Sequence, residues 1–226
     1  MAESDWAAAL EATGHGIIPG LLGARECGAI AALYGEPARF RSKVVMAKHG
    51  FGRGEYQYFA HPLPARVVEL RRSLYAALVP AANRWAKALG RPTHYPDRLE
   101  AYLEQCHNGG QTRPTPLLLR YGPGDFNCLH QDLYGPAAFP FQVAVLLSKP
   151  ETDFTGGEFV LTQQRPRMQS RVDVIPLRQG DAVAFAGNER PVQGTRGVYR
   201  VRMRHGVSEV RSGQRHTLGI ILHDAE

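Results

Sequence analysis

The chain has 226 residues, 43% of them hydrophobic, and a formal net charge of +6 at pH 7. This length is typical of one domain, or of one domain with an extension. No stretch approaches the eighteen consecutive apolar residues of a membrane-spanning helix, and the acidic amino terminus lacks the features of a signal peptide. Three cysteines (Cys27, Cys106 and Cys128) have no zinc or redox spacing, so we expect reduced thiols in a cytoplasmic protein that does not contact membranes.

The positive charge is concentrated in one part of the chain. Nine arginines lie between Arg165 and Arg204, against only Asp173, Asp181 and Glu189. A basic face favours polyanions, because binding releases their counterions. The charge therefore makes nucleic acid a candidate partner, although an ordinary solvated surface would have the same composition.

The first part of the chain, residues 1–112, is predicted to be mainly helical. Apolar residues recur at helical intervals in 24–34, 65–89 and 97–107, and we expect Pro80 to kink or split the second of these. Residues 48–59, which are rich in glycine and aromatics, suit a hairpin or loop better than a helix. We expect this part to be a helical extension packed on the domain that follows.

The second part, residues 113–226, is predicted to consist of short strands. Gly, Pro, Asn and Asp clusters separate six apolar segments, which are 117–121, 141–148, 157–163, 181–187, 198–205 and 216–222. Many short strands with regular turn signals favour a sandwich or barrel over a parallel sheet. The expected fold is a jelly roll, mainly β with some α.

Three residues of this part have the chemistry and phase of a metal site. His130 and Asp132 lie two positions apart, which puts both side chains on one face of a strand. In the segment 198–205, His205 shares its face with Val201 and Met203 and should point inward. Two histidines and one carboxylate form the facial triad that leaves coordination positions open on Fe(II). A metal would also explain an inward aspartate, because burying an unpaired carboxylate is costly.

Each of these residues also has an ordinary structural interpretation, since an isolated His-x-Asp occurs by chance and a single histidine is often a core or surface residue. His216 and His223 are second choices as ligands. Arg215 is in phase with Thr217 and can form a bidentate pair with a carboxylate, unless it makes a surface salt bridge. Tyr121, at the end of a strand, is a candidate phenol donor or an ordinary core tyrosine.

The second half of the chain resembles the Fe(II)/2-oxoglutarate dioxygenases, in particular their prolyl 4-hydroxylase-like and AlkB-like branches. The resemblance is carried by RYGPGDFNCLHQD (120–132), VAVLLS (143–148), TGGEFVL (155–161), QGDAVAF (179–185) and HGVSEVRSGQRHTLGIILHDA (205–225). The first part, including residues 40–64, is similar to a bacterial family of these enzymes named as oxygenases acting on damaged nucleic acid. The expected core, residues 113–226, is thus a double-stranded β-helix.

The resemblance implies a reaction and a set of roles. His130, Asp132 and His205 would hold Fe(II), while Arg215, Thr217 and Tyr121 would bind the distal carboxylate of 2-oxoglutarate. Dioxygen would be the oxidant, with ascorbate as an accessory reductant. The products would be a hydroxylated C–H group, succinate and carbon dioxide, and hydroxylation of an N-methyl group would release formaldehyde. No side-chain general base would be required.

The substrate is left open by the sequence. Damaged or methylated nucleic acid is one hypothesis, in which Phe51, Tyr56 and Tyr58 would stack a single-stranded or flipped base and Arg200, Arg202 and Arg204 would contact phosphates. The same aromatics could instead pack the extension onto the barrel. A protein side chain or small molecule is the alternative substrate. A non-catalytic jelly-roll module that binds metal or ligand is the alternative of another class.

Overall fold

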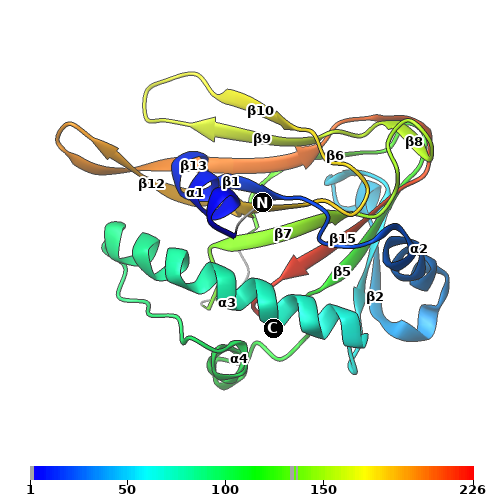
Figure 1. Ribbon diagram of the computed structural model, residues 1–226, viewed down its shortest axis with the longest axis horizontal. Helices are drawn as coiled ribbons and strands as arrows, with labels where there is room; N and C mark the ends of the chain where they lie inside the picture. The colour runs from blue at the N-terminus through cyan, green and yellow to red at the C-terminus, as the bar shows by residue number, and fades with distance from the viewer. Residues whose placement is uncertain (1–2, 133–134, 136) are drawn as a thin grey trace.

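Two antiparallel sheets form the body of the protein, described by a computed structural model for residues 3–132, 135 and 137–226 (Figure 1). The larger sheet has seven strands in the order β1 (His15–Ile18), β11 (Ala182–Ala186), β7 (Phe141–Leu146), β15 (Arg215–Ile221), β5 (Leu117–Tyr121), β4 (Glu55–Phe59) and β2 (Phe40–Val45). The second sheet has the order β10 (Arg171–Ile175), β9 (Phe159–Gln164), β13 (Gly197–Val207), β6 (Phe126–His130) and β3 (Gly52–Arg53), with β12 (Glu189–Gly194) also paired to β13. A two-stranded sheet joins β8 (Phe154–Gly156) to β14 (Val210–Gly213).

Four helices lie against this sandwich. They are α1 (Glu3–Thr13), α2 (Ala24–Ala32), α3 (Ala65–Ala88) and α4 (Leu99–Asn108), with short 3-10 turns at Leu33–Gly35, Pro37–Arg39 and Met46–Lys48. In Figure 1, α3 crosses beneath the sheet that contains β7, β15 and β5, and α4 lies below it. The main buried cluster joins Leu74 and Leu78 of α3 to the larger sheet, and it continues between the sheets through Phe185 and Met203.

The six expected strands of the second part are all present, as β5, β7, β9, β11, β13 and β15. Alternation along β13 follows the predicted phase, since Val201, Met203 and His205 are buried and the arginines between them are exposed. The expected β sandwich with helices packed on it is therefore confirmed. Strands β10 and β12 were not expected, because polar and exposed residues hide their pattern.

The first part of the chain contributes more strands than its pattern predicts. Strand β1 pairs with β11, β4 pairs with β5, and β3 pairs with β6, so residues before 112 extend both sheets. The segment 48–59 is not helical, as expected, but its two strands join different sheets. The division into 1–112 and 113–226 remains a prediction about domain organisation.

Pro80, which was expected to kink or split the long helix, does not split it. Helix α3 runs from Ala65 to Ala88 with Pro80 inside it. Because proline has no N–H group, the carbonyl of Ala76, four residues earlier, receives no helical hydrogen bond. Pro80 and Ala76 are both exposed on the solvent face of the helix. Water can therefore satisfy the freed carbonyl, and the opposite face of the helix stays packed on the sheet.

Candidate metal centre and cavity

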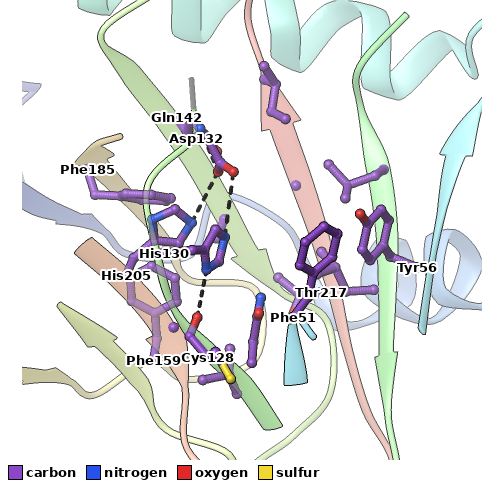
Figure 2. Close-up of a pocket in the computed structure, with 18 of the residues that line it drawn as sticks. Phe51, Tyr56, Cys128, His130, Asp132, Gln142, Phe159, Phe185, His205 and Thr217 are labelled. Atoms are coloured by element: carbon purple, nitrogen blue, oxygen red, sulfur yellow. Dashed lines mark hydrogen bonds and ion pairs between the residues drawn. The ribbon is translucent and has the colours of Figure 1, made fainter. Parts of the chain in front are cut away.

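The sandwich brings His130, Asp132 and His205 together. His130 ends β6, Asp132 follows two residues later, and His205 on β13 pairs directly with His130 across the ladder. Candidate ligand atoms of the three residues all lie within 4.8 Å of one another. The two imidazole rings have centroids 4.1 Å apart, and Asp132 faces both of them, as Figure 2 shows.

Burial, neighbouring charges and hydrogen bonding together set the protonation of His130 and Asp132. His130 Nδ1 lies 2.8 Å from the carbonyl oxygen of Cys128, so it must donate, which leaves Nε2 with a lone pair 3.6 Å from Asp132 Oδ1. Burial, followed by the neighbouring His205, lowers the pKa of His130. Burial alone would raise the pKa of Asp132, but hydrogen bonding and charge from His205, with smaller contributions from His130 and Gln142, hold that pKa below its usual range. A neutral imidazole beside a carboxylate is a donor set for a divalent cation.

Packing, rather than hydrogen bonding at Nδ1, orients the ring of His205. Its Nε2 lies 3.3 Å from Asp132 Oδ2, while its buried Nδ1 has no hydrogen-bond partner in the described part of the chain. The ring lies 4.6 Å from the ring of Phe185 and 6.1 Å from that of Phe159. Figure 2 shows both phenylalanines on the side of the cluster away from Tyr56 and Thr217.

The cluster forms one wall of a cavity of about 430 Å³, and a buried arginine lies in another. Arg215 is 2% exposed, and its Nη1 donates to Thr217 Oγ1 at 2.6 Å. Tyr121, directly opposite Arg215 in the sheet, is fully buried. Among the described residues, Arg215 Nε has no hydrogen-bond partner and the guanidinium forms no ion pair within 4.0 Å, while the Tyr121 hydroxyl has only the nearby side chain of Asn127 as a hydrogen-bonding neighbour.

Such unsatisfied donors fit an anionic ligand. A buried cation without a counter-ion is costly, and a bound carboxylate would satisfy it with a charge-assisted pair. Burial lowers the pKa of Arg215 to about 10 and raises that of Tyr121 to about 12, so both keep their protons near neutral pH. The cavity can therefore hold a carboxylate-bearing cosubstrate such as 2-oxoglutarate at Arg215, with a divalent metal ion at the triad.

The other predicted residues divide into two groups. Phe51, Tyr56 and Tyr58 line the same cavity, Phe51 being 48% exposed and the two tyrosine rings lying 5.4 Å apart edge to face. Arg200, Arg202 and Arg204 of β13 are exposed on the outer face of the six-stranded sheet. They do not line the cavity.

The second-choice histidines lie away from the metal cluster. The ring of His216 packs edge to face on Tyr34 at 5.9 Å. His223 is buried, accepts the backbone N–H of Phe139 at 3.2 Å, and has its pKa lowered to about 4 by burial. Both therefore have structural partners of their own.

Several cavity residues were not predicted from the sequence. Gln142 donates to Asp132 Oδ2 at 2.9 Å, and Gln131 donates to Asn188 and to the carbonyl of Met203, which ties the His-x-Asp segment to β13. Gln142 could have been noticed in the sequence, because it is a polar residue near the start of the apolar segment 141–148. Phe159 and Phe185 had no signal that distinguishes them from core residues.

The fold is that of the 2OG-Fe(II) oxygenases. A prolyl-4-hydroxylase from Pseudomonas putida superposes with a TM-score of 0.58 at 14% identity, each chain being covered completely. An oxidoreductase of the 2OG-Fe(II) oxygenase family from Burkholderia pseudomallei gives a TM-score of 0.57 at 19% identity over 100% of this chain and 93% of the other. The expected jelly roll is therefore confirmed.

Residues 54–225 match the family Oxygenase-NA, described as "Oxygenase, catalysing oxidative methylation of damaged DNA", and the chain belongs to this family. An uncharacterized protein of Mycobacterium tuberculosis, Rv2227, is 49% identical over 167 residues, which cover 74% of this chain and 72% of that protein. Together with the fold and the His–Asp–His cluster, membership confirms the expected class, an Fe(II)/2-oxoglutarate oxygenase. Among the described residues, no helix is both long and apolar enough to cross a membrane.

Proposed function

We propose that His130, Asp132 and His205 bind Fe(II) and that Arg215, Thr217 and Tyr121 bind the distal carboxylate of 2-oxoglutarate. The observation that carries this proposal is one cavity that contains both a His–Asp–His cluster within 4.8 Å and a buried arginine without a carboxylate partner in the described chain. When bound, the metal and cosubstrate would supply the oxidation of a substrate C–H by dioxygen, with release of succinate and carbon dioxide.

The residues of the chain would bind, orient and shield the reactants. Arg215 and Thr217 would form one anchored end of the cavity, since the guanidinium is already fixed by its bond to the Thr217 hydroxyl. Phe159 and Phe185 would keep water away from the imidazole of His205. No titrating side chain is needed as a general base in this scheme.

We further propose damaged or methylated nucleic acid as the substrate. Three observations support it, namely the description of the family, the net charge of +6, and the aromatic residues in the cavity. Phe51 is placed at an exposed position where it could stack on a base, with Tyr56 and Tyr58 deeper in the same cavity. Hydroxylation of an N-methyl group would give a hemiaminal that loses formaldehyde and restores the base.

The proposed division of labour places the metal and cosubstrate in the core 113–226 and the aromatic substrate wall in the extension 1–112. Because the three cysteines are free thiols, of which Cys128 is exposed, we propose the reducing cytoplasm as the compartment.

The test is succinate release from purified protein supplied with Fe(II), 2-oxoglutarate and oxygen, with and without ascorbate. Methylated single-stranded DNA or RNA should stimulate succinate release and yield formaldehyde, because oxidation is coupled to a bound substrate. Asp132→Ala should abolish both signals, since it removes the carboxylate ligand.

Two outcomes would contradict the proposal. Unchanged succinate release by Asp132→Ala would refute the ligand assignment. If peptide pools stimulated succinate release and no nucleic acid did, the substrate would be a protein, and the reaction class would be unchanged.

A further inference from the structure

A buried glutamine stands beside the metal cluster in a strand that is otherwise apolar. Gln142 lies near the start of β7, every residue of which is buried, and is itself 7% exposed. A polar side chain in such a strand is costly unless it is hydrogen-bonded. Its amide nitrogen donates to Asp132 Oδ2 at 2.9 Å. Figure 2 shows the two side chains next to each other at one end of the cluster.

Side-chain contacts contribute to the position of the Asp132 carboxylate. Strand β6 ends at His130, so the ladder that fixes His130 and His205 does not extend to Asp132. The backbone N–H of Asp132 reaches the carbonyl of Gly187 over a long 3.4 Å. The bond from Gln142, in contrast, is of normal length and comes from the middle of the larger sheet.

The surroundings of Gln142 fix its backbone and leave space for its amide. Its backbone pairs with Phe185 on β11 and with Ile221 on β15, so the strand is flanked on both sides. Gly187 leaves room for the amide, because a Cβ there would lie 3.3 Å from the Gln142 nitrogen. The donor thus belongs to an interior strand paired on both sides, whereas the acceptor follows a strand end.

The chemistry of the contact is unambiguous. An ionised carboxylate only accepts hydrogen bonds, so the NH₂ group of Gln142 must face Asp132. Asp132 Oδ2 also lies 3.3 Å from His205 Nε2, and Oδ1 is the oxygen nearer His130. By engaging Oδ2, Gln142 selects the rotation of the carboxylate between the two imidazoles.

We propose that Gln142 is a positioning residue of the metal centre, which holds the Asp132 carboxylate in the orientation that binds a divalent cation together with His130 and His205. This inference rests on the proposed function. Groups that orient metal ligands in this way typically contribute a factor of about 10–100 to metal affinity. Gln142 does not itself need to touch metal, cosubstrate or substrate.

The test measures Mn(II) binding to the metal-free protein, which requires no turnover. Gln142→Leu and Gln142→Met both remove the donor but differ in shape, so loss of the hydrogen bond should weaken Mn(II) binding by the same factor in both, about 10–100-fold. Gln57→Leu is the matched control, because Gln57 is also 7% exposed and donates to the carbonyl of Tyr34 at 3.0 Å, outside the cavity. The Gln57→Leu variant should lose about as much melting temperature as the Gln142 variants. Its Mn(II) affinity should nevertheless equal that of the wild type.

Wild-type affinity in both Gln142 variants would overturn the inference while leaving the proposed metal centre intact. A large difference between the Leu and Met variants would also overturn it, because packing would then be the cause. Absence of Mn(II) binding by the wild type would instead refute the metal centre itself.

Discussion

At the scale of single residues, Arg215 has an environment that a protein would not keep for stability alone. The guanidinium is buried, bonded to one hydroxyl, and lies 5.6 Å from the ring of Tyr121 and 5.9 Å from that of Phe154. Replacing a buried charge by an apolar side chain of similar volume is often neutral or stabilising. This cost accords with the proposed role of Arg215 as the anchor of the cosubstrate carboxylate.

We predict that Arg215→Met separates stability from cosubstrate binding. The variant should melt at or above the wild-type temperature without cosubstrate, since the cost of burying an unpaired charge is removed. It should bind 2-oxoglutarate more weakly by about 2–5 kcal/mol, the usual loss when one partner of a buried charge pair is truncated. Thermal shift in the presence of metal, with and without 2-oxoglutarate, measures both effects.

The control for this prediction is Arg190→Met. Arg190 is also buried, but its guanidinium donates to the carbonyl of Ala12 and to Gln163, so its loss should lower the melting temperature. If Arg215→Met lowered the melting temperature as much as Arg190→Met and left 2-oxoglutarate binding unchanged, Arg215 would be a structural residue.

At the scale of elements, the strand that carries the proposed cosubstrate anchor is fixed at its end by the long helix. Arg71 of α3 donates to the carbonyls of Ile221 and Leu222, each at 3.2 Å, where β15 ends. It also forms a buried ion pair with Asp224 at 2.6 Å. The helix thus holds the end of the strand that begins with Arg215.

We predict very different costs for two neighbouring arginines of α3. Arg71→Met leaves Asp224 buried without this cation and should lower the free energy of unfolding by about 3–5 kcal/mol. Arg72→Met breaks an exposed pair with Glu100 and should cost about 0–1 kcal/mol. Urea denaturation measures both, and equal costs would show that the Arg71 contacts do not stabilise the end of β15.

At the scale of the whole molecule, charge is distributed unevenly over the sandwich. In Figure 1, α3 and α4 lie below the larger sheet, whereas β9, β10 and β13 lie near the top of the view, with α1 drawn in front of β13. Arg200, Arg202 and Arg204 are exposed at alternate positions of β13. Alternate residues of a strand are about 6.8 Å apart, which gives a regular row of positive charge.

We predict that this row contributes to nucleic-acid binding through phosphates. For single strands, each phosphate contact contributes about 0.7 to the slope of log K against log salt concentration. Changing all three arginines to Gln should therefore make that slope shallower by about 2 for single-stranded DNA. The control changes three exposed arginines on the helical side, Arg25, Arg72 and Arg98, and so alters net charge equally. Identical slopes for both variants would place the phosphate contacts elsewhere.

Much of the site was determined by local sequence alone. The period of two along a strand placed His205 on the buried side of β13 and put Arg215 in phase with Thr217, because side chains alternate whatever the strand pairs with. The expected shared strand face of His130 and Asp132 was wrong, because β6 ends at His130 and the chain beyond that end brings Asp132 to the cluster. The chemistry of these residue types then indicated the metal and the carboxylate ligand.

Only the tertiary structure decided which distant segments meet. Strand β1 lies beside β11, Gln142 reaches Asp132, and Arg71 meets Asp224 from the other end of the chain. Periodicity predicted a mainly helical first part because the segments that form β2 and β4 are short and partly polar. These segments become strands by pairing with strands formed by later residues. Periodicity reports which side of an element is apolar, but the partner that covers that side is a property of the folded chain.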